Sequence, residues 1–218
     1  MSGAADGRPI VIIGTGEGRC VLETCRDLGL AVAGFLDTRR PAGEIVNDCP
    51  VLGGEALLDD PAFVAAHRFA PSVGEGGRRL AYAARVERLG GGLATLVHPS
   101  NRVSLYAEIG AGSILLGKSV VNPNASLGRC VLVDWDCTIG HDDRLGDGVF
   151  LAPGCHLGGR VVCEAECFLG LGAIVVPDVR IGARSVVGAG STVTRDLPAD
   201  VVALGNPAKV VKRRERAA

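Results

Sequence analysis

The stretch that decides the fold is IGHDDRLGDGVFLAPGCHLGG, residues 139–159, in which an aliphatic residue returns at every sixth position. The step is marked here by Ile139, Leu145, Leu151 and Leu157. It extends from Val103 to Val193, and all sixteen positions are aliphatic except Cys163. A short fixed period of this kind is typical of a parallel β-helix, in which each repeat is one short strand and a corner. The sequence therefore predicts a β-helix filled by these side chains.

Two other positions of the repeat are also restricted. Glycine follows the aliphatic residue at positions 110, 128, 140, 146, 158, 170, 182 and 188. We expect these glycines to form corners, because glycine tolerates unusual φ angles. The fourth position after the aliphatic residue is small at Ala107, Ser113, Ser119, Ala125, Cys137, Cys155, Cys167, Ala173, Ser185 and Ser191. This position is predicted to be a tight packing slot.

The eight cysteines are predicted to be buried free thiols. No C-x-x-C pair occurs, and three of the cysteines occupy the small packing slot. The amino-terminal sequence lacks a charged segment followed by a cleavage site, so a disulfide framework is not expected. The ligand spacing does not fit a zinc cluster.

Composition excludes some classes of function. The net charge is −1, which gives no electrostatic reason for binding nucleic acid or an acidic membrane surface. No apolar run approaches the roughly 18 residues that cross a bilayer. We expect a cytoplasmic protein without a membrane anchor.

Residues 1–96 follow a different pattern, in which predicted strands and helices alternate. Strands are expected at residues 9–14, 30–37, 67–74 and 93–99, with helices after residue 18 and over 77–90. This alternation predicts a parallel sheet with right-handed crossovers. The expected division is therefore residues 1–96, a β-helix over 97–200 and a tail over 201–218.

A glycine-rich turn, GTGEGR, follows the first predicted strand. Its spacing departs from G-x-G-x-x-G, yet backbone amides at a helix start can still bind phosphate. Asp37, at the end of the second strand, stands where an acid that binds ribose or base is expected. The stretch SVGEGG at residues 72–77 is expected to line the same pocket. The candidate nucleotide-binding residues are Gly14, Thr15, Gly16, Glu17, Gly18, Asp37 and Gly74.

The repeat [LIV]-G-x-x-[small]-x resembles the left-handed β-helix of the hexapeptide acyltransferases. The whole chain is similar to members that fuse a small Rossmann-like nucleotide-binding domain to that β-helix, the sialic acid O-acetyltransferases and nucleotide-sugar N-acetyltransferases. The resemblance implies coils of three repeats, a homotrimer with active sites between subunits, acetyl-CoA as donor and no metal. It also implies a nucleotide-linked 4-amino-4,6-dideoxy sugar as acceptor, GDP-perosamine above all, and a role in O-antigen biosynthesis.

An 18-residue coil stacks His141 between Pro123 and Gly159, which leaves open space beside the imidazole. The pair His141-Asp142 matches a histidine followed by an acid in the family, so His141 is expected to be the general base and Asp142 its orienting carboxylate. Asp142 is also expected within ion-pair reach of Arg160. Asp143 falls in an otherwise apolar column, where a carboxylate needs hydrogen bonds, so it is a second candidate for support.

The sequence departs from the family near this pair. Gly140 replaces an acid that often precedes the histidine, and Phe150 stands where relatives often carry a second histidine. His141 would therefore act without a second histidine, with backbone amides around Gly159 stabilising the oxyanion. The resemblance places CoA near Gly159, Gly172, Ala173, Gly190 and Lys209.

Residues that precede the interior aliphatic should point outward. On one face they form an apolar ladder of Ile114, Leu132, Phe150, Phe168 and Val186. Such a ladder indicates an interface. We interpret it as part of a trimer contact, with cover by the amino-terminal domain as the alternative.

Three other functions stay open. A sugar O-acetyltransferase would share the fold, donor and base. A β-helix carbonic anhydrase would need three zinc-binding histidines, and the available ones are His98, His141 and His156. A non-catalytic nucleotide-sugar sensor would bind its ligand without releasing CoA.

Overall fold

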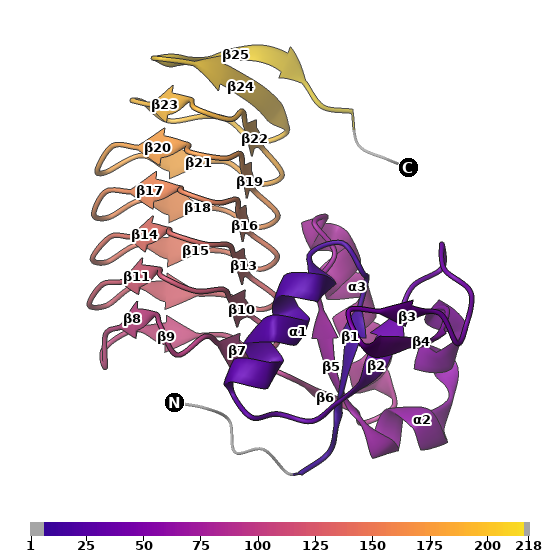
Figure 1. The fold of residues 1–218 in the computed structure, drawn as a ribbon. Coiled ribbons are helices and arrows are strands. Elements are labelled where there is room, and N and C mark those ends of the chain that lie inside the picture. Colours follow the sequence, from indigo (N-terminus) through magenta and orange to yellow (C-terminus); the bar gives the residue numbers. More distant parts are fainter. Residues whose placement is uncertain (1–6, 216–218) are drawn as a thin grey trace.

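The structure is a computed structural model that describes residues 7–215. Two parts are visible in Figure 1: a tall stack of short strands and an α/β unit against the side of its lower coils. None of the helices in residues 7–215 is long and apolar enough to cross a membrane.

The stack is a parallel β-helix with three sheets, as the six-residue period predicts. Sheet one contains β7 (Leu96–Val97), β10 (Ile114–Leu115), β13 (Leu132–Val133), β16 (Phe150–Leu151), β19 (Phe168–Leu169) and β22 (Val186–Val187). Sheet two contains β8 (Arg102–Val103), β11 (Val120–Val121), β14 (Thr138–Ile139), β17 (His156–Leu157), β20 (Ile174–Val175) and β23 (Thr192–Val193). Sheet three contains β9 (Glu108–Ile109), β12 (Ser126–Leu127), β15 (Arg144–Leu145), β18 (Val162–Cys163) and β21 (Arg180–Ile181). Each predicted interior position is the second residue of a two-residue strand.

The chain ends in an antiparallel hairpin above the coils. Its strands are β24 (Val201–Gly205) and β25 (Ala208–Arg213), and β24 extends sheet one by pairing with β22. The hairpin covers the upper end of the interior, because Val201, Ala203 and Ala208 join the core of the β-helix.

The interior confirms the predicted packing slot. Cys155 and Cys167 are buried free thiols whose Sγ atoms donate to the carbonyls of Gly170 and Gly182, each at 3.2 Å. Ser113 makes the equivalent bond to Gly128 at 2.8 Å. At these three positions the small side chain of the slot therefore also satisfies a carbonyl of the next coil. All eight cysteines are free, and only Cys20 is not fully buried.

The reason expected for the repeat glycines was wrong. Positive φ falls three residues after the interior aliphatic, as at Asp142 with φ 61°, rather than at the glycine that directly follows it. Gly140 is instead required by space, because a Cβ there would lie 2.3 Å from the carbonyl oxygen of Gly158 in the next coil. At Gly140 the next coil therefore approaches too closely for a side chain on this backbone.

The α/β unit contains a six-stranded sheet in the order β3-β4-β2-β1-β5-β6, parallel except for the β3–β4 hairpin. Its strands are β1 (Ile10–Ile13), β2 (Val32–Leu36), β3 (Ile45–Val46), β4 (Cys49–Gly53), β5 (Arg68–Pro71) and β6 (Gly92–Leu93). Its helices are α1 (Gly18–Asp27), the 3-10 turn η1 (Glu55–Asp59), α2 (Pro61–Ala66) and α3 (Gly76–Arg88). The strand expected over residues 93–99 is divided, since β6 joins this sheet and β7 starts sheet one.

The lower part of the exterior apolar ladder contacts the α/β unit, so the alternative is confirmed there and the interpretation as a trimer contact is wrong for Ile114, Leu132 and Phe150. Ile114, Leu132 and Phe150 are buried in one cluster with side chains from β1 and α1, and Phe168 packs against its edge. Figure 1 shows the unit lying against this side of the coils. Burial of these side chains supplies the apolar contact that holds the two parts together.

A buried arginine completes this junction. Arg79 on α3 is 1% exposed, and its guanidinium donates to the carbonyls of Cys130, Gly148 and Val149 in the β-helix at 2.7–3.0 Å. It also donates to Val73 and Gly74 in its own unit. Burial lowers the pKa of Arg79 to about 10, yet the group stays protonated at neutral pH.

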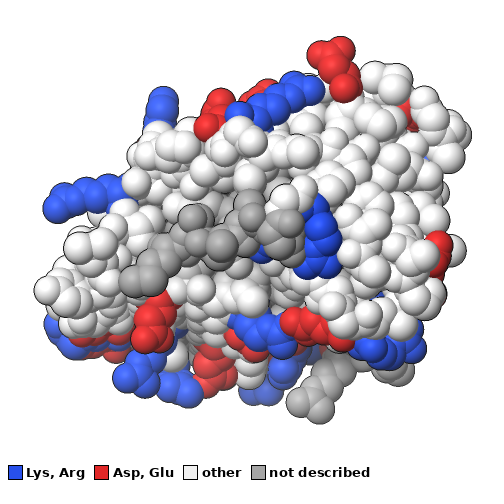
Figure 2. All heavy atoms as spheres, turned by 90° about the horizontal axis from the view of Figure 1, so that it is seen from below, with Lys and Arg blue, Asp and Glu red and all other residues white. Residues whose placement is uncertain are grey.

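The charged surface is mixed. Figure 2 shows Lys and Arg side chains interleaved with Asp and Glu on the face seen from below, without a continuous field of one sign. This agrees with the net charge of −1 and with the absence of an electrostatic case for a nucleic-acid partner.

Candidate functional site

His141 lies at the corner between sheets two and three, directly after β14. Its Nδ1 atom is 2.7 Å from Oδ2 of Asp142, and Asn124 donates to the other carboxylate oxygen at 3.1 Å. The hydrogen bonds from His141 and then Asn124 lower the pKa of Asp142, which keeps it ionised. An ionised carboxylate can only accept a hydrogen bond, so Nδ1 carries the proton and donates it, and Nε2 of the neutral ring is left as the free acceptor.

Gly159 lies directly against this imidazole. A Cβ at this position would come within 2.4 Å of Nε2 of His141. Gly159 is therefore the neighbour of His141, as predicted, and only glycine leaves room for the imidazole in this position. The side chain of His141 remains 54% exposed, so its free nitrogen is accessible to a reactant.

Asp143 points the opposite way, into the β-helix. It is fully buried and accepts hydrogen bonds from the backbone amides of Gly140 at 2.6 Å and Val161 at 2.8 Å. Burial raises its pKa to about 6, against the opposing effect of the two amides. The hydrogen bonds expected for this carboxylate are confirmed, and Asp143 connects two coils beneath the histidine.

The expected ion pair between Asp142 and Arg160 is wrong. Arg160 donates instead to both carboxylate oxygens of Asp178, at 2.6 and 2.8 Å, in the following coil. The stacked coils place Arg160 between Asp142 and Asp178. Two parallel hydrogen bonds to the one carboxylate of Asp178 suit the planar guanidinium better than single bonds to each aspartate.

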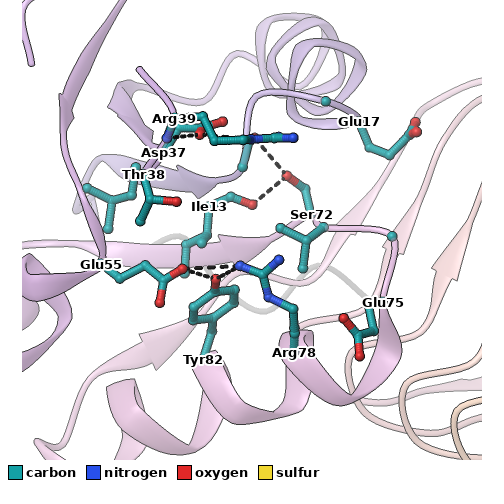
Figure 3. A pocket seen from close by; sticks show the side chains of 15 residues that line it. Ile13, Glu17, Asp37, Thr38, Arg39, Glu55, Ser72, Glu75, Arg78 and Tyr82 are labelled. Atoms are coloured by element: carbon teal, nitrogen blue, oxygen red, sulfur yellow. Dashed lines mark hydrogen bonds and ion pairs between the residues drawn. The ribbon is translucent and has the colours of Figure 1, made fainter. Parts of the chain in front are cut away.

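A cavity of about 320 Å³ opens in the α/β unit at the carboxyl ends of β1, β2 and β5. Strand order reverses around β1, which is where ligands bind in open parallel sheets. We call it the α/β cavity; Figure 3 shows side chains that line it. Five of the predicted nucleotide residues line it: Gly14, Gly16, Glu17, Asp37 and Gly74.

Thr15 and Gly18, also predicted to bind nucleotide, do not line the cavity but hold the turn that does. Thr15 is buried and donates through its amide and hydroxyl to Asp37, at 3.0 and 2.6 Å. Gly18 begins α1, and a Cβ there would lie 3.0 Å from Ile12. Gly14 has φ 95°, and a Cβ there would clash with Val73 at 2.7 Å, so glycine is required in the turn.

The Asp37 carboxylate already accepts hydrogen bonds from within the protein, which the sequence did not predict. Burial would raise its pKa, but bonds from Thr15 and from the backbone of Arg39 lower it to about 2. The carboxylate therefore fixes the glycine turn to the end of β2 as well as facing the cavity.

A cluster of side chains on the cavity wall could not be predicted from the sequence. Glu55 from η1 accepts from the hydroxyl of Tyr82 and from Arg78, which is 3.2 Å away, and both donors are on α3 (Figure 3). Arg78 also donates to the Tyr82 hydroxyl at 2.6 Å. The only sequence signal is the four-residue spacing of Arg78 and Tyr82, which places both on one face of a helix.

The residues expected near CoA do not form one group within the chain. Gly159 lies with His141, whereas Gly172 and Gly190 occupy the corner between sheets one and two, with φ 65° and 64°. Ala173 is buried and Lys209 is exposed on β25. A Cβ on Gly172 or Gly190 would meet no atom within 4 Å, so this corner is open to contact from outside.

His141 and the α/β cavity lie on different sides of the β-helix. The unit packs on sheet one, while the histidine lies at the opposite corner, between sheets two and three. Phe150, expected where relatives carry a histidine, is buried on sheet one under the α/β unit and does not share the His141 corner. One chain therefore does not bring the two parts of the predicted site together.

The histidines of residues 7–215 do not form a metal site. No group of three His, Cys, Asp or Glu side chains in this range could hold an ion. His98 bonds to Asp27 at 2.8 Å, and His156 bonds to Thr138 at 3.2 Å. Within this range, the arrangement that a zinc carbonic anhydrase needs is therefore not formed.

Comparison with known proteins identifies relatives. No protein-family model matches the chain. A GDP-perosamine N-acetyltransferase of Escherichia coli O157:H7 is 32% identical over 124 residues, which is 55% of this chain. The match covers 56% of that protein, so the chain spans about half the length of this curated relative.

Solved structures match over nearly the whole chain. The perosamine N-acetyltransferase of Caulobacter crescentus, crystallised as a histidine-to-asparagine variant with CoA and GDP-perosamine, is 32% identical with a TM-score of 0.89. The match covers 94% of this chain and 97% of that one. The acetyltransferase domain of PglB from Neisseria gonorrhoeae, solved with acetyl coenzyme A, is 33% identical with a TM-score of 0.87 over 94% and 99% of the two chains. The chain belongs to the hexapeptide-repeat acetyltransferases.

Proposed function

We propose that the protein transfers an acetyl group from acetyl-CoA to the amine of a nucleotide-linked 4-amino-4,6-dideoxy sugar, with GDP-perosamine as the first candidate. The observation that carries the proposal is the His141–Asp142 pair, with Nε2 free beside Gly159, in a chain that matches a perosamine N-acetyltransferase along its length. That relative binds CoA and GDP-perosamine, and the PglB domain binds acetyl coenzyme A.

The reaction is a direct transfer in a ternary complex. The sugar nitrogen attacks the thioester carbonyl carbon, a C–N bond forms, and Nε2 of His141 takes the proton from nitrogen. Asp142 holds the ring through Nδ1 and stabilises the imidazolium that results. The C–S bond then breaks, and the CoA sulfur takes the proton from His141 to leave as the free thiol.

The developing oxyanion needs a donor close to the histidine. The backbone amide of Gly159 is proposed for this role, since this residue lies against Nε2 of His141 and its amide donates to no acceptor among residues 7–215. The role of His141 as general base is supported by this geometry and by its exposure.

A complete site requires more than one copy of the chain. The nucleotide sugar would bind in the α/β cavity of one subunit, and His141 would come from the next subunit of a homotrimer. The CoA arm would run along the open corner at Gly172, Ala173 and Gly190 toward Lys209. This arrangement is supported by the position of His141 on the side of the β-helix away from the α/β unit.

The proposal assigns each part of the chain a task. Residues 1–96 form a Rossmann-like nucleotide-sugar domain, residues 97–200 a left-handed β-helix that carries the chemistry, and residues 201–218 a tail. The α/β cavity at the strand ends supports the first assignment.

The test is a release assay for free CoA thiol with a panel of nucleotide-linked sugars. We expect turnover with GDP-perosamine and none with the analogue that carries a hydroxyl in place of the amine. Preference for the hydroxyl would indicate an O-acetyltransferase. Ligand binding without thiol release from any member of the panel would indicate a sensor.

A further inference from the structure

The backbone ladder of the β-helix is interrupted directly before His141. Over residues 98–176, the residue that follows each interior position donates its amide to the carbonyl of the interior residue one coil later. Gly140 is the one member of this series that does not, although Leu157 occupies the matching interior position. Strands β14 and β17 accordingly pair at a single position, whereas the β11–β14 and β17–β20 pairs match at two. The coil that carries the histidine is therefore held differently from its neighbours.

The buried carboxylate of Asp143 takes the amide that the ladder loses. Its Oδ2 atom accepts from the Gly140 amide at 2.6 Å, and its Oδ1 atom accepts from the Val161 amide of the next coil at 2.8 Å. An ionised carboxylate has acceptors alone, so both oxygens need donors once water is excluded. The Gly140 amide supplies one of them.

Ser119 shows what the packing slot does elsewhere. Its hydroxyl accepts from the amide of Cys137 at 3.0 Å and donates to the carbonyl of Asp134 at 3.1 Å. A hydroxyl thus satisfies one donor and one acceptor of the next coil and leaves the ladder intact. Asp143 occupies an equivalent slot but cannot donate, and this difference accounts for the diverted Gly140 amide.

The two amides that Asp143 accepts flank the proposed chemistry. Gly140 immediately precedes the base His141, and Val161 lies two residues after Gly159, whose amide is proposed for the oxyanion. The side chain of Asp143 is fully buried, so it reaches neither reactant. It acts on the backbone that carries both groups.

We infer that Asp143 is a positioning residue for the acetyl transfer, which holds the backbone at Gly140 and Val161 and so sets the separation between His141 and the amide of Gly159. The inference rests on the proposed function and assigns it a residue that touches no substrate.

The bonds require Asp143 in its ionised form, since a protonated carboxyl has one oxygen less to accept an amide. Burial raises its pKa to about 6, so the ionised form dominates at pH 8. His141 and Asp142 interact with it from its own corner, and Cys163 of β18 interacts with it from the next coil. Burial raises the pKa of Cys163 well above its ordinary value, so this thiol stays neutral.

The variant Asp143→Ser separates positioning from folding, because serine can make the bonds that Ser119 makes and frees the Gly140 amide for the ladder. We expect Tm at pH 8 to equal or exceed that of wild type, since a buried charge is removed. We expect kcat to fall about tenfold with KM for both substrates within about twofold. Asp143→Asn, which keeps one acceptor, should lie between. Ala125→Ser, in the same column one coil earlier, is the matched control and should leave kcat unchanged.

The pH dependence gives a second reading. The ratio of kcat between wild type and Asp143→Ser should be about tenfold at pH 8 and approach one below pH 5, where wild type carries a protonated Asp143. Unchanged kcat in Asp143→Ser, a ratio that is constant with pH, or a Tm that falls together with kcat would overturn the inference.

Proton NMR of the His141 ring, assigned with His141→Asn, needs no turnover. Its resonances should move in Asp143→Ser and stay in place in Ala125→Ser. Ring resonances that are the same in wild type and Asp143→Ser contradict the inference alone. Wild-type protein that releases no thiol with any sugar of the panel contradicts the proposed function itself.

Discussion

Asp142 holds His141 by one ring nitrogen, with Oδ2 at 2.7 Å from Nδ1. Asp142 has φ 61°, a left-handed conformation that brings its carboxylate back beside the preceding side chain. Aspartate and asparagine adopt this conformation more readily than most residues. The corner of the coil therefore determines both the tautomer and the orientation of the imidazole.

The variant Asp142→Asn tests this relationship without disturbing the backbone. An amide cannot stabilise the imidazolium as a carboxylate does, so we expect kcat to fall about 10- to 100-fold with KM for both substrates nearly unchanged. Thiol-release kinetics give both constants. Unchanged kcat would remove Asp142 from the mechanism, and Asn124→Ala, which affects the outer oxygen alone, provides the comparison.

Arg79 is predicted to control the stability of the junction. Arg79→Met removes hydrogen bonds to five carbonyls, of which Val149 keeps its bond from the Leu132 amide, and should lower the free energy of unfolding by about 3–5 kcal/mol. Arg79→Lys should cost less, because it keeps the charge but offers fewer donors. Urea unfolding measures both, and Arg88→Met, which removes an exposed ion pair, should cost at most about 1 kcal/mol. Equal losses of unfolding free energy for Arg79→Met and Arg88→Met would show that the buried hydrogen bonds stabilise the protein no more than an exposed ion pair does.

Asp37 is predicted to make stability depend on pH at the acid end. Its pKa is lowered to about 2, below its ordinary value, so the folded state favours the ionised form. The resulting stability, on the order of 2 kcal/mol, is present above about pH 4 and is lost as pH falls toward 2. Asp37→Asn should therefore be less stable than wild type at pH 6, with a difference that shrinks by pH 2.5. A difference that is constant with pH would contradict the assigned cause.

Sharing of the site between subunits is tested with two inactive variants. His141→Asn removes the base, and Gly16→Phe blocks the α/β cavity at a position where a Cβ would meet no atom within 4 Å. Coexpressed in equal amounts, they should recover about a quarter of wild-type activity, because each site draws its histidine and its cavity from different copies. Activity that stays at the level of the separate variants would place the whole site in one chain.

The six-residue period allowed the β-helix to be predicted strand by strand. Each coil contributes one short strand to each of the three sheets, and the narrow interior has room for one aliphatic side chain from each strand. It also predicted the neighbours of His141, since Gly159 lies one coil later in the same column. Side-chain pairing was less predictable. Arg160 has an aspartate in both adjacent coils, and only geometry shows that it binds Asp178.

The contact between the two parts of the chain could not be derived in the same way. The ladder that includes Phe150 indicates an interface, but hydrophobicity does not identify the partner, and the α/β unit covers it. The cluster of Glu55, Arg78 and Tyr82 combines a turn and a helix that are separated in sequence. No local pattern relates them, so the wall of the α/β cavity was missed.

The most direct test of the account is thiol release from acetyl-CoA with GDP-perosamine, comparing wild type with His141→Asn. Asparagine preserves a polar side chain beside Gly159 but cannot accept the proton from the amine. We predict that kcat falls by about 10²-fold or more while the Kd of GDP-perosamine and of CoA stays within about twofold. Turnover of the variant near the wild-type rate would contradict the assignment of His141 as the general base.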